Sequence, residues 1–235
     1  MTGYLFIVYN PKMNANEIMK TEENLKWRRQ PEKRPDDILA GALIEFRLKG
    51  FKGARIEDIA KHAGLSKGTV YLYFKSKEEM LKALVRRSII PTALSLKEIA
   101  ENVCDHNSDE PASDVLRKML MLVAKQMIGE KAGAIPILII GEAGRFPELA
   151  EFYRNEVIES SMKALSSVIR RGIDQNEFRE LDIMISLRTL MGAVIMQVIW
   201  SGVFAANDEA RLSASDLINN HIDIFLNGVL TPKKA

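Results

Sequence analysis

Apolar residues return every three or four positions along most of the chain, which is the period of a helix with one buried face. The pattern starts at Pro35 and is clear at Ile38, Leu39, Ala42 and Phe46. Sustained runs that alternate apolar and polar residues, the signature of a half-buried sheet, are absent. The sequence therefore predicts an all-α fold.

Residues that begin or end helices divide this pattern into segments. Pro35 suits the first turn of a helix, and Gly50 suits the position just after its end. Ser76 and Glu79 have the spacing of a capping box, which starts another helix. The predicted helices cover residues 35–49, 56–63, 67–74, 76–88, 92–105, 113–129, 135–143, 147–171, 182–204 and 213–228.

The segment 56–74 has the pattern of a helix-turn-helix. One short helix covers 56–63 and a second covers 67–74, with Gly64 between them. Glycine tolerates the positive φ that such a tight turn requires. We expect Leu65 to fill the angle between the two helices.

The second of these helices has two different sides. At 100° per residue, Val70 and Phe74 fall together and are expected to face the core. The rest of its circumference carries small, hydroxyl, aromatic and methyl-bearing residues, namely Gly68, Thr69, Tyr71, Leu72 and Tyr73. Such groups suit a helix that approaches base edges and phosphates in the major groove. A short surface helix with two half-exposed tyrosines is the plainer alternative.

Charge along the chain is uneven. Residues 1–90 carry 18 Lys and Arg against 11 Asp and Glu, a balance of +7, whereas residues 91–235 carry 15 against 20, a balance of −5. Lys67, Lys75 and Lys77 surround the second helix and are suited to neutralising phosphate. The imbalance indicates a polyanion partner for the first part only, although uneven solvated faces give the same numbers.

The exact string around this turn resembles the TetR (tetracycline-repressor) family of AcrR-like transcriptional regulators. Residues 35–90 as a whole are similar to the DNA-binding domain of that family. The resemblance is carried by Ile59-Ala60, then Ala63-Gly64-Leu65-Ser66-Lys67-Gly68-Thr69-Val70-Tyr71, then Tyr73-Phe74-Lys75-Ser76-Lys77. It implies an N-terminal three-helix helix-turn-helix domain joined to a larger helical domain for ligand binding and dimerisation.

The resemblance also implies which residues contact DNA. Those matching Lys67, Gly68, Thr69 and Tyr71 approach bases and phosphates in such proteins, and those matching Tyr73 and Lys77 bind the backbone. The family has Thr or Ser where Ala54-Arg55 stands here, so a hydroxyl cap is missing and Arg55 replaces the phosphate contact by charge. The candidate DNA-binding residues are Arg55, Ser66, Lys67, Gly68, Thr69, Tyr71, Leu72, Tyr73 and Lys77.

The sequence divides into a tail and two domains. We expect a tail over residues 1–31, a DNA-binding domain over 32–92 with its recognition region at 55–74, and a ligand-binding and dimerisation domain over 93–235. The tail ends in a basic stretch that includes Trp27. It is either a disordered leader or an arm that touches DNA phosphate or the minor groove.

A single recognition helix buries little DNA, so we expect a homodimer on a palindromic operator. Two long apolar helices, 147–171 and 182–204, are candidates for a four-helix interface, with internal core as the alternative. The apolar residues named for the first of them are Leu149, Phe152, Ile158, Leu165, Val168 and Ile169. The family resemblance implies that helices over 92–143 enclose a small-molecule effector, but no ligand-binding residue is assigned.

Other classes of protein find less support. The three histidines are scattered, Cys104 is the only cysteine, and no nucleophile, P-loop or dinucleotide motif is present. We therefore expect no enzyme, no cofactor and no metal site. No signal peptide or membrane span is predicted, which indicates a cytoplasmic protein. The alternative functions are an effector-independent DNA-binding regulator, an architectural protein, or a helical protein that uses its basic end on membranes.

Overall fold

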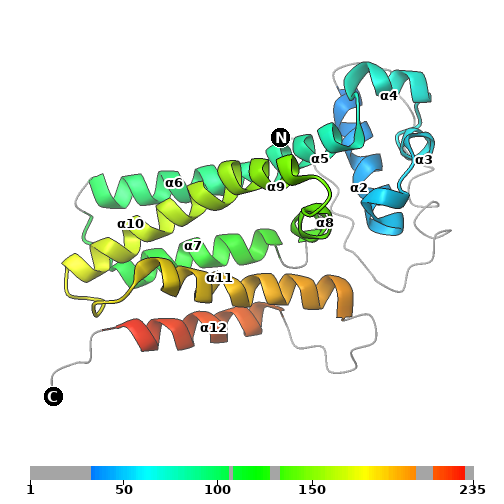
Figure 1. The fold of residues 1–235 in the computed structure, drawn as a ribbon. Coiled ribbons are helices and arrows are strands. Elements are labelled where there is room, and N and C mark those ends of the chain that lie inside the picture. The colour runs from blue at the N-terminus through cyan, green and yellow to red at the C-terminus, as the bar shows by residue number, and fades with distance from the viewer. Residues whose placement is uncertain (1–32, 106–107, 128–132, 205–213, 231–235) are drawn as a thin grey trace.

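The computed structural model describes residues 33–105, 108–127, 133–204 and 214–230, and every regular element in these ranges is helical (Figure 1). Within this part of the chain, β-pairing is limited to an isolated bridge between Phe178 and Leu230. The tail predicted for 1–31 lies outside the described residues. The elements are α2 (Arg34–Gly53), α3 (Ile56–His62), α4 (Lys67–Tyr73), α5 (Lys77–Ser88), α6 (Ile90–Asp105), α7 (Ala112–Met127), α8 (Ala134–Glu142), α9 (Pro147–Tyr153), the π-helical turn η3 (Arg154–Glu159), α10 (Ser160–Asp174), α11 (Ile183–Ile199), the π-helical turn η4 (Trp200–Phe204) and α12 (Ala214–Val229).

The predicted helices lie where the sequence placed them, with end residues shifted by a few positions. Gly50 has the expected left-handed backbone, with a φ of 68°, but the chain resumes a helical path to Gly53 after it. The predicted helix 147–171 is divided by the π turn η3, and the predicted helix 182–204 ends in the π turn η4. Capping residues and the spacing of apolar positions therefore located the helices, whereas nothing in the local sequence marked the two π turns.

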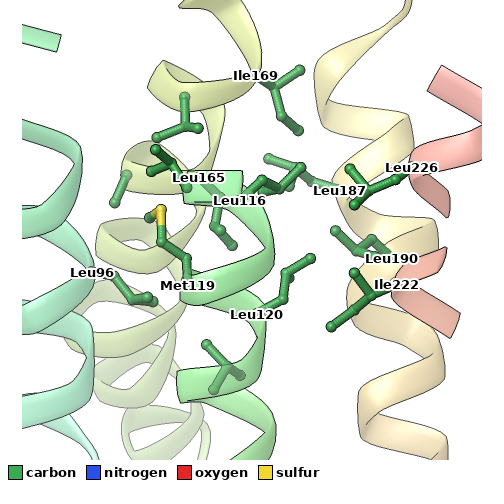
Figure 2. Packing of buried hydrophobic residues seen from close by; sticks show 14 of the residues in the cluster. Leu96, Leu116, Met119, Leu120, Leu165, Ile169, Leu187, Leu190, Ile222 and Leu226 are labelled. Atoms are coloured by element: carbon green, nitrogen blue, oxygen red, sulfur yellow. The ribbon is translucent and has the colours of Figure 1, made fainter. Parts of the chain in front are cut away.

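The larger part of the molecule is a layered helical body with α7 in its middle. α6 and α10 pack together on one side of α7, and α11 and α12 lie on the other (Figure 1). Figure 2 shows the side chains that fill the space between these layers. Met119 of α7 meets the α6 and α10 side, whereas Leu120 faces Leu190 and Ile222 of the outer pair. Burying each such side chain stabilises the fold by roughly 1.5–3 kcal/mol.

The start of α7 is capped from a distant loop. The Glu177 carboxylate accepts hydrogen bonds from the backbone N–H groups of Ala112 at 2.6 Å and Ser113 at 2.9 Å. A carboxylate at a helix N-terminus satisfies N–H groups that have no partner within the helix and complements the helix dipole. This contact ties the end of α10 to α7 and helps to fix the body.

A second hydrophobic core joins the DNA-binding helices to part of the body. It contains the buried residues of α2–α5, and it also contains Ile135 and Ile139 of α8 with Leu149 and Tyr153 of α9. The Phe51 and Phe146 rings meet edge to face, with centroids 5.5 Å apart. The segment α8–α9 therefore packs against the N-terminal helices, and the linking helix α5 is not the only connection between the two parts.

One part of the interface prediction is wrong. Leu149, Leu165, Val168 and Ile169 are buried inside a single chain, so these apolar residues of 147–171 form internal core, which was the alternative. Only Ile158 among the six named residues is substantially exposed. Helical spacing marks an apolar face, and it does not tell whether the same chain or a partner covers that face.

Candidate nucleic-acid interface

A tight turn sets the angle between α3 and α4. Gly64 has a φ of 62°, in the left-handed region that favours glycine. The Leu65 N–H donates to the Ala60 carbonyl at 2.8 Å, which closes the turn, and the Leu65 side chain packs against the N-terminal core. The predicted positive φ of Gly64 is confirmed, and Leu65 points inward as expected.

The recognition helix α4 is capped by a side chain. Ser66 Oγ accepts a hydrogen bond from the Thr69 N–H at 3.1 Å, as an N-cap serine should. The same Oγ lies 2.9 Å from the Thr69 hydroxyl, so the two hydroxyl groups form a pair at the helix start. This pair holds Thr69 in one orientation before any ligand is present.

The two sides of α4 differ as the helical wheel predicts. Val70 is fully buried and Phe74 is 7% exposed, so they anchor the helix from behind. Tyr71 is 46% exposed and Leu72 is 81% exposed, and Gly68 is exposed beside them. Tyr71 and Leu72 are therefore open to a ligand on the side of α4 that faces away from the core.

Lys67 is paired within the chain. Its Nζ lies 2.5 Å from Glu57 Oε1 on α3 and 5.9 Å from the centroid of the Tyr71 ring. The hydrogen bond from Lys67 is the main cause that lowers the pKa of Glu57, and the same bond raises the pKa of Lys67. The first lysine of the recognition helix is therefore held as one half of a neutral pair.

Lys77, expected to contact the DNA backbone, binds carbonyl oxygens of its own chain. Its Nζ donates to the carbonyl oxygens of Phe51 at 2.6 Å, Ala54 at 3.0 Å and Lys52 at 3.2 Å, and it lies 5.0 Å from the Phe51 ring centroid. An ammonium group has three donors, so these carbonyls occupy all of them. Lys77 joins the end of α2 to the start of α5, and its phosphate contact stays a prediction.

Arg55 stands at the N-cap of α3 with an exposed side chain and no side-chain capping bond. The missing hydroxyl cap is thus confirmed, and the guanidinium remains available to solvent on the side where α3 begins. Tyr73 is half-buried against the core, so only part of its ring is open to a ligand.

A polar seam fixes α3 on α2. Glu45 is the charged side chain that the structure buries within the described ranges, and its carboxylate lies 2.7 Å from Lys49 Nζ and 3.3 Å from His62 Nε2. Lys49 also reaches Asp58 at 2.9 Å. A buried carboxylate needs such partners, and here they come from both helices of the pair. The buried Glu45 carboxylate therefore joins α2 to α3, the helix that precedes α4 across the Gly64 turn.

Two family models match this chain, and together they cover most of it. The model described as "Bacterial regulatory proteins, tetR family" matches residues 38–84, and the model described as "Tetracyclin repressor-like, C-terminal domain" matches residues 108–215. The chain belongs to the TetR family. It is therefore a DNA-binding transcriptional regulator with the helix-turn-helix that the sequence predicted, and it belongs to a family of regulators rather than enzymes.

Curated members of the TetR family are similar over most of their length. The "Fatty acid metabolism regulator protein" of Bacillus subtilis is 23% identical over 84% of this chain and 97% of its own. The "HTH-type transcriptional repressor KstR2" of Mycolicibacterium smegmatis is 24% identical over 85% of this chain and 92% of its own.

Solved TetR-family structures share the fold. The ketosteroid regulator KstR2 of Mycobacterium tuberculosis superposes with a TM-score of 0.65 at 24% identity, covering 86% of this chain and 98% of that one. FadR of Bacillus subtilis in complex with stearoyl-CoA gives 0.63 at 22% identity, covering 82% and 98%. A regulator of Saccharomonospora viridis in complex with choline gives 0.68 at 20% identity, covering 86% and 100%.

Sequence reasoning missed two contacts of this TetR-type domain. The Glu57 carboxylate holds Lys67 ten positions away, a pairing that the sequence did not predict. Lys77 was assigned to phosphate, yet it binds carbonyls more than twenty positions away. Both contacts join residues on opposite sides of a turn, so the spacing of apolar residues along one helix could not predict them.

No helix in the described ranges has the length and apolarity that a bilayer crossing requires.

Proposed function

We propose that this chain is a homodimeric repressor that binds a palindromic operator through α4 and is released from it by a small-molecule inducer. The observation that carries the proposal is the division of α4 into a buried anchor, Val70 and Phe74, and an open face with Tyr71 and Leu72 at its centre. A helix anchored in this way can enter the major groove as a rigid unit. We place the protein in the cytoplasm, where it would meet its operator DNA.

The proposed contacts follow from the chemistry of each residue. Gly68 lets the helix start approach the groove closely, Thr69 offers a hydroxyl and a methyl group, and Leu72 suits a thymine methyl. Tyr71 and Tyr73 reach phosphate or sugar with their hydroxyl groups. Arg55 and Lys75 supply positive charge around the helix, with Ser66 at its N-terminus, and Lys67 donates from its pair with Glu57. Lys77 joins this set only after it leaves the carbonyls that it now binds.

The proposed dimer uses the outer face of α11 and α12. These helices lie together along one side of the body (Figure 1). The exposed large apolar residues of α11, η4 and α12 are Met184, Ile185, Met196, Trp200, Phe204 and Ile224. Exposed apolar side chains on neighbouring helices suit an isologous contact with a second copy. Such a dimer sets two copies of α4 at a fixed distance, as successive major grooves require.

The proposed response to a ligand runs through α8 and α9. Both helices pack on the N-terminal core, and Ile137 of α8 packs on the core of the body. On α5, Lys82 Nζ lies 5.6 Å and Arg86 Cζ lies 4.9 Å from the centroid of the Phe152 ring of α9. A ligand that favours another position of α8 and α9 tilts the DNA-binding helices and lowers operator affinity, with a typical coupling of about 1–3 kcal/mol.

An effector-independent regulator or architectural protein is the alternative, and one observation favours it. The described body is densely filled, with Leu116, Met119 and Leu165 fully buried at its centre. A hollow between α6 and α10 holds about 210 Å³, which is less than small-molecule sites commonly hold. A larger hollow of about 600 Å³, lined by Gly141, Glu142, Gly144 and Arg145, is wide open to solvent and encloses no ligand-sized cavity.

The test begins with selection of bound duplexes from a randomised library. The proposal predicts a palindromic site whose half-sites are about one helical turn apart. Affinity for that site is then measured with a long-chain acyl-CoA, a ketosteroid and choline, the effector types named in the relatives. Release by a small molecule supports the inducible repressor. Enrichment of no sequence contradicts the proposal, and affinity unchanged by every effector supports the alternative.

A further inference from the structure

Glu57, the acidic partner of Lys67 in an ion pair, has no role of its own in the proposed DNA contacts. Both side chains are about half exposed, and they join the first turn of α3 to the first residue of α4. Because the carboxylate balances the ammonium charge, the recognition helix starts with a lysine held in a net-neutral ion pair instead of a free cation. This inference rests on the proposed function, since it assumes that α4 meets DNA.

We propose that Glu57 is a specificity-determining residue, which directs Lys67 away from phosphates and toward neutral acceptors on base edges. A lysine ammonium has three N–H donors, and Glu57 occupies one of them. The other two can still donate to the O6 and N7 atoms of a guanine, which are neutral acceptors in the major groove. Base contact is therefore compatible with an intact pair.

Phosphate contact is not compatible with the pair in the same way. Binding to the DNA backbone draws its free energy from the release of counterions by free positive charges. A lysine that is already neutralised releases little, and the Glu57 carboxylate itself repels a nearby phosphate. Lys67 contributes to sequence-independent binding only after its ion pair with Glu57 has broken. Glu57 therefore lowers the affinity for random DNA more than the affinity for the operator.

The neighbours of the pair show that Glu57, and not the adjacent Asp58, is the acidic partner of Lys67. The Tyr71 ring lies 5.9 Å from the lysine Nζ on the α4 side. The acidic neighbour Asp58 is turned to Lys49 and Lys61 instead, at 2.9 Å and 3.5 Å. The two acidic residues of the same helical turn thus have different partners, and only Glu57 faces the recognition helix.

This difference gives a matched control. Glu57→Gln and Asp58→Asn each remove one negative charge from the same turn of α3, but only the first frees Lys67. Dissociation constants are measured for the operator found by selection and for a shuffled duplex of the same composition, over a range of salt concentrations. The double variant Glu57→Gln with Lys67→Gln shows whether any effect depends on the lysine.

We expect Glu57→Gln to bind the shuffled duplex about two- to fivefold more tightly, the range that one exposed ion pair spans. Its slope of log affinity against log salt should steepen by about 0.9, the value of one added phosphate contact. Operator affinity should rise less, so the ratio of operator to shuffled affinity falls. Asp58→Asn should keep the wild-type ratio, and the double variant should lose the gain.

Two results overturn the inference while leaving the proposed function intact. One is an unchanged affinity ratio in Glu57→Gln relative to Asp58→Asn, with the wild-type protein still selective for its site. The other is a gain that persists in the double variant. A wild-type protein that prefers no duplex overturns the proposed function itself, and the inference with it.

Discussion

Phe51 near the end of α2 and Phe146 just before α9 meet edge to face across the boundary between the DNA-binding helices and the body, with ring centroids 5.5 Å apart. Phe51 is buried and also contacts Phe46 and the ammonium of Lys77. One aromatic ring therefore links the end of α2, the start of α5 and the α8–α9 segment. We expect a movement of α9 to reach the recognition helices through this ring.

A double-mutant cycle should detect this link. Phe51→Leu and Phe146→Leu each keep an apolar side chain but remove the ring contact. Aromatic pairs contribute about 0.5–1.5 kcal/mol beyond burial, so we expect a coupling of that size in the free energy of unfolding. Urea denaturation of the four proteins measures it. Strictly additive effects would contradict a direct contact between the two rings.

Gly41 is expected to tolerate no side chain. A Cβ built on this residue lies 2.9 Å from the Ile59 carbonyl oxygen and 3.1 Å from the Ala63 nitrogen, so α2 and α3 touch backbone to backbone there. Gly41→Val should lower the free energy of unfolding by roughly 1–3 kcal/mol, as overpacking does, and disturb operator binding with it. Gly144→Val is the control, because nothing lies within 4 Å of its Cβ. Equal thermal stability of the two variants would refute the close approach.

Stability should fall in strong alkali through Tyr153. Burial raises the pKa of this phenol from its ordinary 10.0 to about 12. The unfolded chain loses the proton near pH 10 and the folded chain keeps it to about pH 12, so this stabilisation is complete below pH 10 and is lost as the pH rises through 12. Two units correspond to about 2–3 kcal/mol.

Phe substitution isolates this contribution. In Tyr153→Phe the free energy of unfolding should fall less between pH 10 and 12 than in the wild-type protein. Tyr73→Phe, which alters a half-buried tyrosine, serves as the comparison. Denaturant titrations at a series of pH values measure both. A wild-type pH dependence in Tyr153→Phe would exclude a buried, neutral phenol at this position.

The oligomeric state should respond to charge on α11. Met196 is 50% exposed within the proposed dimer face, and Ile140 is similarly exposed on α8, outside it. A buried unpaired carboxylate is strongly unfavourable, so Met196→Glu should produce monomers with weak operator affinity. Ile140→Glu should remain a dimer. Sedimentation equilibrium reports the mass of each variant, and a dimeric Met196→Glu protein would move the interface elsewhere.

The sequence predicts the helices of this fold well, because caps and periods are local. The Ser66 cap, the Gly64 turn and the buried positions of Val70 and Phe74 all follow from residues within a few positions of one another. The capping box is confirmed in half: Ser76 accepts from the Glu79 N–H, but Glu79 accepts from the Lys75 N–H instead of that of Ser76.

Contacts between distant segments could not be predicted from the sequence. The Glu177 cap on α7 spans more than sixty positions, and the packing of α8–α9 on the N-terminal core joins residues about a hundred positions apart. An apolar period also leaves open which chain covers a face, which is why Leu165 and Val168 were misplaced in an interface. The division of the chain at residues 92 and 93 and the assigned DNA contacts remain predictions.

The central claim is that the open face of α4 reads the DNA sequence, and Thr69→Ala combined with Tyr71→Ala tests it most directly. Their affinity for the selected operator is compared with that for a shuffled duplex, beside thermal unfolding of the same protein. We expect the preference for the operator to disappear while the unfolding temperature stays close to that of the wild type, because both residues lie outside the core. A doubly substituted protein that still prefers its operator as strongly as the wild type would contradict the account.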